Sequence, residues 1–183
     1  MVSLLSLLFV FHLLVIMSSS IPTTSEKFAK ESPIFPSTKP MEKLTQLHFY
    51  FHDHIKGKNP TSLIIVQPPT RFGTLYIMDD FLTEGPSPSS KLVGRSQGMY
   101  ATSSQHGFDF FMATSFLFTE GIYNGSTLSI VGRNADMPTR EIPIVGGTGV
   151  FRYARGSAWL TTYMFNVTSG VAIVEYNVSV VHV

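Results

Sequence analysis

The sequence predicts an all-β fold in which one domain holds about eight antiparallel strands. Three observations lead to this prediction. From Leu44 onward apolar and polar residues alternate with a period of two, Gly, Pro and Asn-Gly turns separate the alternating runs, and no helical stripe of ten residues or more occurs outside the first twenty residues. Such alternation is typical of strands with one buried face. Eight strands can form a sandwich or a closed barrel, and a closed barrel leaves no exposed strand edge.

The first twenty residues are expected to be a secretory signal peptide. They carry no charge, and the apolar run from Leu4 to Met17 is interrupted only by Ser6 and His12 and is followed by three serines. This run is shorter than the roughly 20 residues that a membrane-spanning helix needs, and it fits the apolar segment of a secretory leader. We expect residues 1–20 to be cleaved and no membrane attachment afterwards; an uncleaved anchor is the alternative.

The rest of the chain divides into an arm and a domain. Residues 21–43 mix Pro, Ser, Thr and Lys without either hydrophobic period, which predicts a flexible N-terminal arm. The folded domain is expected over residues 44–183. Its candidate strands, each bounded by turn residues, are 45–53, 62–68, 73–80, 92–102, 108–118, 126–132, 152–164 and 171–182. In the last strand, alternation directs Tyr176 toward the core and Asn177 toward solvent.

Composition excludes several classes of function. The chain has 13 basic and 12 acidic residues and a formal net charge of +1, so it offers little of the clustered positive charge expected of a nucleic-acid-binding face. With no cysteine, it has no disulfide, thiolate zinc site, iron–sulfur cluster or cysteine nucleophile. Charged residues make up 14% and aromatic residues 13%, which favours a packed aromatic core over disorder.

Three N-glycosylation sequons support the expectation of secretion. They begin at Asn124, Asn166 and Asn177, whereas the run Asn59-Pro60-Thr61 fails because proline occupies its middle position. We therefore expect a secreted, extracellular glycoprotein with these three asparagines as its glycan acceptors.

The first candidate strand carries the most informative chemistry. By alternation, Phe49, Phe51 and Asp53 share one face. A carboxylate that continues an aromatic face is uncommon because its burial is costly. Inside a barrel the pKa of Asp53 would rise, which suits a proton donor or acceptor. The alternative is that Asp53 ends the strand in water and caps the Lys56-Gly57 turn.

The opposite face of the same strand presents three histidines, His48, His52 and His54. His-x-His on a strand is a known spacing of metal ligands. Residues opposite an apolar face are expected to face solvent, however, and His106 lies in a predicted loop. We therefore expect no metal site.

Other motifs give weaker signals. No Lys-Ser/Thr and no helix follow the glycine-rich run 146–149, so it is interpreted as a turn and not as a phosphate cradle. The pair Asp79-Asp80 is interpreted as a solvated turn, with a calcium site as the alternative. Arg140 presents a fork of donors suited to an oxyanion or a phenolate, although a surface ion pair with Asp136 or Glu141 is the simpler interpretation.

Several of these segments together resemble a known family. The resemblance rests on FYFHDHIKGKNPTS (49–62), MDDFLTEGP (78–86), KLVGRSQGMYA (91–101), GIYNGSTLSIVGRN (121–134), REIPIVGGTGVFRYARG (140–156) and VEYNVSVVHV (174–183). In this order and spacing they closely resemble the plant dirigent proteins over residues 44–183.

The resemblance implies an eight-stranded antiparallel β-barrel of the dirigent and allene-oxide-cyclase type, usually a trimer, secreted to the apoplast or cell wall and glycosylated. It implies no cofactor and no oxidative centre. A separate laccase or peroxidase would supply phenoxy radicals, for example from coniferyl alcohol, and the dirigent protein would hold two of them so that an optically active lignan forms. Proximity and orientation would be its main contribution. The alternative that the resemblance allows is a lyase that dehydrates an isoflavanol through a quinone methide to a pterocarpan.

The resemblance also implies roles for individual residues. Asp53 matches the acid of the family's His-Asp motif, which assists proton transfer to the quinone methide, and Tyr100 and Arg140 match a pocket tyrosine and a pocket arginine. Lignan-forming members have an aspartate where this chain has Asn134, and an amide cannot donate a proton as an acid does. Asp136, in a shifted loop, is the alternative candidate for this second acid position.

Overall fold

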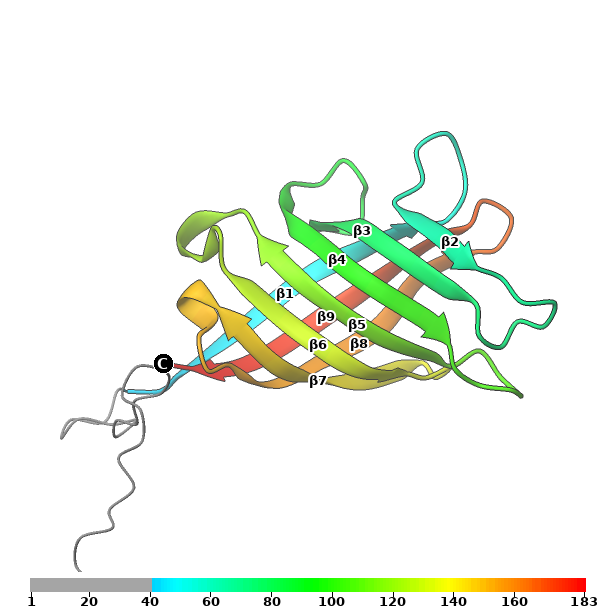
Figure 1. Ribbon diagram of the computed structural model, residues 1–183. Coiled ribbons are helices and arrows are strands. Elements are labelled where there is room, and N and C mark those ends of the chain that lie inside the picture. The colour runs from blue at the N-terminus through cyan, green and yellow to red at the C-terminus, as the bar shows by residue number, and fades with distance from the viewer. Residues whose placement is uncertain (1–40) are drawn as a thin grey trace, which may run out of the picture. The chain divides into compact units, whose positions relative to one another are not determined.

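The computed structural model describes residues 41–183, and the predicted signal peptide and the predicted arm up to residue 40 lie outside this range. The described chain forms nine strands and two short 3-10 helices (Figure 1). In chain order they are β1 (Lys43–His54), β2 (Ser62–Val66), β3 (Leu75–Thr83), β4 (Leu92–Thr102), β5 (Phe110–Phe118), η1 (Gly121–Tyr123), β6 (Thr127–Asn134), β7 (Thr139–Thr148), η2 (Gly149–Phe151), β8 (Arg155–Asn166) and β9 (Val171–His182). Within residues 41–183 no helix has the length and apolar character to cross a membrane.

Eight of the strands close into an antiparallel barrel, which confirms the predicted fold class. The order around the ring is β1-β9-β8-β7-β6-β5-β4-β3, and pairing between β1 and β3 closes it. Most neighbours pair over many residues, as β1 and β9 do from Lys43 to His54. The closing pair is much shorter, because β1 meets β3 only at Tyr50, Phe51 and His52. We call this short β1–β3 pairing the seam of the barrel.

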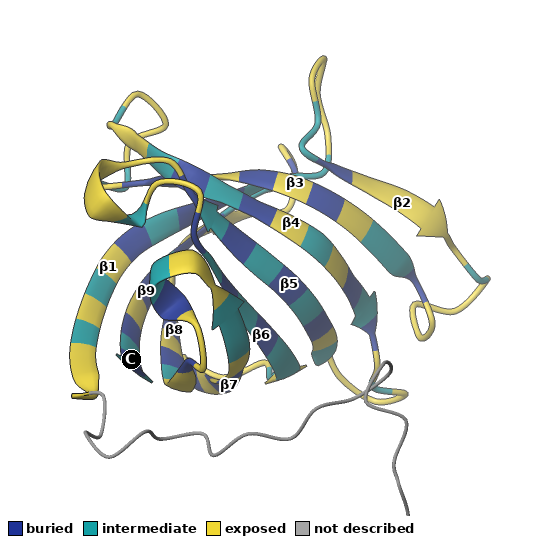
Figure 2. Cartoon of the chain, turned by 60° about the vertical axis from the view of Figure 1, so that its left-hand side comes forward, coloured by how far each residue is buried: buried dark blue, intermediate teal, exposed yellow. Residues whose placement is uncertain are grey.

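Strand β2 lies outside the closed ring and continues the seam. It pairs only with β3, along the stretch of that strand from Leu75 to Met78 that β1 does not reach. Figure 2 shows β2 splayed from the barrel on this edge. The strand predicted at 62–68 therefore exists but does not belong to the eight barrel strands.

The eighth barrel strand is β7, which the sequence interpretation missed. Its sequence TREIPIVGGT contains a proline and two glycines, which usually indicate a turn. Pro143 is tolerated because the pairing with β6 spans Ile144 to Thr148 and stops before the proline. At Gly147 a Cβ would lie 2.6 Å from the carbonyl oxygens of Thr127 and Phe151, so the strand needs glycine there. The predicted turn at 146–149 is thus mostly strand.

One half of the barrel is filled by side chains. Phe49, Phe116 and Tyr176 are almost fully buried, and Phe49 stacks on Tyr176 with ring centroids 5.4 Å apart. The burial bands that alternate along the strands in Figure 2 are the period-two pattern of the sequence. As predicted for β9, Tyr176 faces the core and Asn177 faces outward. This packed half leaves the other end of the barrel to hold the cavity.

The histidine face of β1 differs from the prediction, most at His52, while His54 is partly buried. His48 is exposed and its ring contacts Glu175 at 2.8 Å. His52, expected in solvent, is only 1% exposed, because it lies at the seam where β3 pairs with β1 and its Nε2 forms a 2.6 Å hydrogen bond with the Thr83 hydroxyl. Burial lowers the pKa of His52, and His54 lowers it further. Within residues 41–183 no three His, Asp or Glu side chains gather as a metal site requires.

Candidate functional site

A cavity of about 1140 Å³ occupies the end of the barrel where β1, β4, β6 and β8 finish. Aromatic and aliphatic side chains form much of its wall, among them Phe51, Tyr76, Phe110, Met112 and Val174. The loops at residues 67–71 and 134–138 also contribute to its lining. Its size lies slightly above the usual range of about 300–1000 Å³ for small-molecule sites.

All four residues predicted as site residues line this one cavity. Asp53 stands near the end of β1, Tyr100 near the end of β4, Asn134 at the end of β6 and Arg140 at the start of β7. The first and the last of them, Asp53 and Arg140, are more than 80 residues apart along the chain, and the closed barrel brings all four together. The solvated-cap interpretation of Asp53 therefore does not hold, since its side chain lies in the cavity wall.

Asp53 and Tyr100 form a hydrogen-bonded acid group. The Tyr100 hydroxyl donates to Oδ2 of Asp53 at 2.8 Å, while Oδ1 is buried without a partner within residues 41–183. Burial raises the pKa of Asp53, although the Tyr100 hydrogen bond opposes the shift. Tyr76 stacks on the Tyr100 ring at a centroid distance of 4.5 Å and holds it in place. Asp53 is thus a carboxyl group that can be protonated closer to neutral pH than an exposed aspartate.

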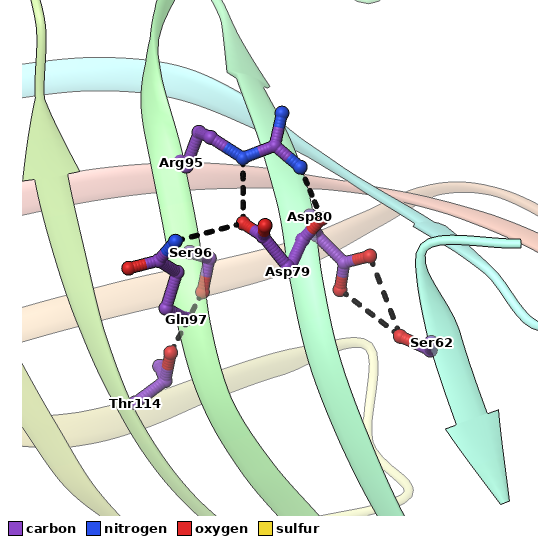
Figure 3. A network of polar contacts seen from close by, with 7 residues as sticks. All are labelled: Ser62, Asp79, Asp80, Arg95, Ser96, Gln97 and Thr114. Atoms are coloured by element: carbon purple, nitrogen blue, oxygen red, sulfur yellow. Dashed lines mark hydrogen bonds and ion pairs between the residues drawn. The ribbon is translucent and has the colours of Figure 1, made fainter.

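Asp80 is a second buried acid that the sequence interpretation missed. The sequence favours a solvated turn for Asp79 and Asp80, but both residues lie within β3. Asp79 points outward and accepts hydrogen bonds from Arg95 and Gln97, whereas Asp80 is 0% exposed and lies 3.3 Å from the Ser62 hydroxyl through each carboxylate oxygen (Figure 3).

The electrostatic surroundings of Asp80 differ from those of an ordinary aspartate. Burial raises its pKa to about 8, and the nearby Asp53 carboxylate contributes to the same rise. The signal that would have found it is the one that found Asp53, because Tyr76, Met78, Asp80 and Leu82 form an apolar face interrupted by one acid. We call Asp53, Asp80 and Tyr100 the acid wall.

Arg140 lies across the barrel from this group and is 8% exposed. Its Nε donates to Asn134 Oδ1 at 3.0 Å, and its Nη1 donates to the Thr162 hydroxyl at 2.9 Å. Among residues 41–183 no carboxylate forms an ion pair with it, so the surface ion pair considered from the sequence is absent there. Burial lowers the pKa of Arg140, but a guanidinium stays charged in a protein. We call Asn134, Arg140 and Thr162 the cation wall.

Asn134 and Asp136 have different positions in this arrangement. The Asn134 amide oxygen accepts from Arg140 and so orients the guanidinium. Asp136 is exposed at the cavity rim, and its backbone N–H donates to Asp109 at 2.9 Å. The residue in contact with the arginine is therefore the asparagine, and it neutralises none of the positive charge.

The sequence and the fold match those of known proteins. The family model described as "Dirigent-like protein" matches residues 44–181. "Dirigent protein 23" of Arabidopsis thaliana is 49% identical over 148 residues, which cover 77% of this chain and 79% of that protein. "Pterocarpan synthase 1" of Glycyrrhiza echinata is 48% identical over 149 residues, which cover 77% of this chain and 79% of that protein.

A solved structure described as that of a pterocarpan synthase dirigent protein aligns with a TM-score of 0.76 and 46% identity. The alignment covers 80% of this chain and 88% of the solved chain.

Proposed function

This chain belongs to the dirigent family, and we propose that it binds a phenolic quinone methide in its barrel cavity and directs the stereochemistry of the bond formed there. One observation carries the proposal: the cavity has a protonatable carboxyl group, Asp53, on one wall and a buried cation without a carboxylate partner, Arg140, on the other. A quinone methide has a carbonyl oxygen that becomes a phenol and an electrophilic carbon that receives the new bond. Its chemistry therefore needs both a proton and stabilisation of an oxygen anion.

The form of this function that the geometry favours is dehydration of an isoflavanol. Asp53 donates a proton to the departing hydroxyl, the C–O bond breaks and water leaves, while a ring phenol releases its proton to solvent, from which it is later regained, and becomes the quinone methide carbonyl. Arg140 stabilises that oxygen while it carries negative charge. A second phenol hydroxyl then adds to the electrophilic carbon and returns a proton to Asp53, and the carbonyl oxygen regains one. The net change is the loss of one water, and the similarity to proteins named pterocarpan synthase supports this form.

A second candidate is stereoselective coupling of two phenoxy radicals to an optically active lignan or related phenolic. The cavity volume of about 1140 Å³ favours it, because this space exceeds what one small phenolic needs. The radicals would come from a separate laccase or peroxidase, so the protein would act as a non-oxidative auxiliary. After coupling, Asp53 and Arg140 would serve the resulting quinone methides as they serve the dehydration.

One assay with two arms tests both forms. Purified protein is incubated with an isoflavanol without any oxidase, and separately with a laccase and coniferyl alcohol, and the products are separated on a chiral column. We expect a single enantiomer of the ring-closed product in the first arm. A single lignan enantiomer in the second arm alone would select the radical form. Racemic or unchanged material in both arms would overturn the proposal.

We also propose that the protein is secreted to the apoplast as a glycosylated trimer. The uncharged leader over residues 1–20 and the exposed positions of Asn124, Asn166 and Asn177 support secretion and glycosylation. An apolar outer face supports association of copies, since solvent-exposed apolar patches mark contact surfaces. This face comprises Leu63, Ile77, Met99 and Phe111.

Expression through a secretory pathway tests these points together. We expect a mass loss on glycosidase treatment and a sedimentation coefficient of a trimer. Retention in the cell, or a monomer that carries no glycan, would contradict them.

A further inference from the structure

Asp53 and Asp80 face each other at the seam of the barrel. The β1–β3 register pairs Tyr50 with Thr83, Phe51 with Leu82 and His52 with Phe81. The next position in this register joins Asp53 to Asp80, at the point where the two strands stop pairing. Residues at opposite positions of an antiparallel pair point to the same face. Both carboxyl groups therefore point into the barrel from adjoining strands.

The start of β2 fills the gap where the two strands separate. The backbone N–H of Thr61 donates to the His54 carbonyl, and the Thr61 carbonyl accepts from the N–H of Asp79, both at 2.9 Å. This places the next residue, Ser62, beside the two acids, and its side chain is 1% exposed. The Ser62 hydroxyl lies 3.3 Å from each carboxylate oxygen of Asp80, and it is near enough to Asp53 to lower the pKa of that carboxyl group.

The pair has no cationic partner among residues 41–183. The titratable groups that act on it are Tyr100 from β4, Tyr176 from β9 and Tyr76 from β3 on the inner side, and Asp79 and His54 from the outer faces of β3 and β1. Two facing carboxylates that are buried without a cation repel each other, and such pairs relieve the repulsion by keeping a proton. Burial raises the pKa of both acids, which agrees with a retained proton.

The hydrogen bonds indicate which acid holds that proton. Asp53 accepts a hydrogen bond from Tyr100 at 2.8 Å, which stabilises its charged form. The Ser62 hydroxyl lies 3.3 Å from each of the two oxygens of Asp80, and one hydroxyl carries one hydrogen. The Thr61 side chain also lowers the pKa of Asp80, but by less than burial raises it. A proton on Asp80 would satisfy the second contact by donating to the Ser62 oxygen. The neutral form is therefore favoured at Asp80 and the charged form at Asp53.

We propose that Asp80 is a positioning residue that holds the proton of an Asp53–Asp80 pair and passes it through the Ser62 hydroxyl to Asp53. The proton balance closes within each turnover. Asp80 gives its proton to the Ser62 oxygen as Ser62 gives its own to Asp53, and Asp53 donates that proton to the departing hydroxyl. The phenol that closes the ring returns a proton to Asp53, and the relay runs back to Asp80. This role rests on the proposed function, whereas the shared proton does not.

The test uses Asp80→Asn and a matched control, Asp79→Asn, on the neighbouring residue that points outward. In the first measurement, aspartate side-chain carboxyls are labelled with ¹³C and titrated by NMR. We expect one protonated carboxyl at pH 7 that titrates near pH 8 in the wild type and in Asp79→Asn, and that is lost in Asp80→Asn. If every buried aspartate is ionised at pH 7, the shared proton is refuted whatever the protein's activity. If Asp80→Asn does not fold, Asp53→Asn replaces it and should lower the pH at which Asp80 titrates.

The second measurement is the pH dependence of isoflavanol dehydration. We expect Asp80→Asn and Ser62→Ala to move the alkaline limb of the kcat profile about one unit or more toward acid, while Asp79→Asn leaves it in place. The NMR titration can give the expected result while the alkaline limb of the kcat profile stays in place. That outcome would refute the proton relay through Ser62 but not the shared proton of the Asp53–Asp80 pair. A wild-type protein inactive on isoflavanols would count against the proposed function, while the NMR titration would still decide the pair.

Discussion

On one side of the cavity lies the acid wall, in which Asp53 and Tyr100 line the cavity and Asp80 is fully buried, and on the other lies the cation wall of Asn134, Arg140 and Thr162. Around the ring they are separated by β9 in one direction and β5 in the other. Each wall buries a group that prefers water. The acid wall can relieve its charge by binding a proton, whereas the cation wall relies on neutral oxygens, because a guanidinium does not lose its proton.

This difference indicates that the two walls would have different roles toward a substrate. The acid wall can change its charge during a reaction and therefore suits proton transfer. The cation wall keeps its charge and therefore suits an oxygen that becomes negative. A substrate with a departing hydroxyl at one end and a phenol at the other would be held in one orientation. Changes confined to one wall should then produce distinct kinetic effects.

The largest effect is expected from Asp53→Asn. The amide keeps the size of the side chain but cannot donate a proton as an acid does, so we expect kcat for isoflavanol dehydration to fall by about 10²-fold or more. Steady-state kinetics with chiral product analysis measures this loss. Asp79→Asn is the matched control and should retain wild-type turnover; equal losses in both variants would contradict the role of the acid wall.

Removal of the buried cation should have the next largest effect. Arg140→Met takes away the donors to the developing phenolate, and we expect kcat/KM to fall by about 10²-fold. The same kinetics on Arg133→Met provides the comparison, because Arg133 is an exposed arginine of β6 bound to Asp109 at 2.7 Å. A loss in Arg133→Met as large as that in Arg140→Met would show that the effect is not specific to the cavity.

A smaller effect concerns stability rather than rate. The pKa of Asp80 is raised in the folded state to about 8, so the folded protein binds a proton that the unfolded chain has released. Its contribution to stability is therefore complete below about pH 4 and is lost as the pH rises toward 8, at up to about 1.4 kcal/mol per pH unit. Urea unfolding followed at several pH values measures this slope. We expect a flatter slope in Asp80→Asn, and parallel curves for the two proteins would contradict the buried acid.

The smallest effect is expected from Asn134→Asp. A carboxylate at this position would pair with Arg140 and compete with a phenolate, so we expect the Kd for an unreactive isoflavan to rise by about tenfold or less. Isothermal titration calorimetry measures this change, and the exposed substitution Asn124→Asp should not alter it. Tighter binding by Asn134→Asp would show that the cation wall does not receive a negatively charged oxygen.

The sequence predicted much of the fold because alternation is a local signal. It predicted the all-β class and the inner face of β9. The choice of a barrel over a sandwich, and of a cavity-facing Asp53 over a solvated cap, came from the family resemblance. The sequence interpretation missed β7 because proline and glycine are typical turn residues. A strand tolerates Pro143 and Gly147 here because of the way β6 and η2 lie against it, which the local sequence does not contain. It missed Asp80 because a paired acid before a Gly-Pro loop resembles a solvated turn, although the same alternation places it inside.

Other features depend on contacts that no local pattern contains. His52 is buried because β3 closes the barrel against β1 at that residue. Arg140 is a cavity group and not a surface ion pair because β7 begins beside the end of β6, where Asn134 is within reach of its guanidinium. The opposition of Asp53 and Asp80 follows from a seam only three residue pairs long. Each of these features depends on the register between strands that are distant in sequence.

The most direct test of the two-wall account is a crystal structure with an isoflavan that lacks the departing hydroxyl and so cannot react. We predict that the ligand lies inside the barrel, with one phenol oxygen within hydrogen-bonding distance of Arg140 and the saturated carbon that would carry the hydroxyl facing Asp53. A ligand bound outside the barrel, or one inside that touches only one of the two walls, would contradict the account.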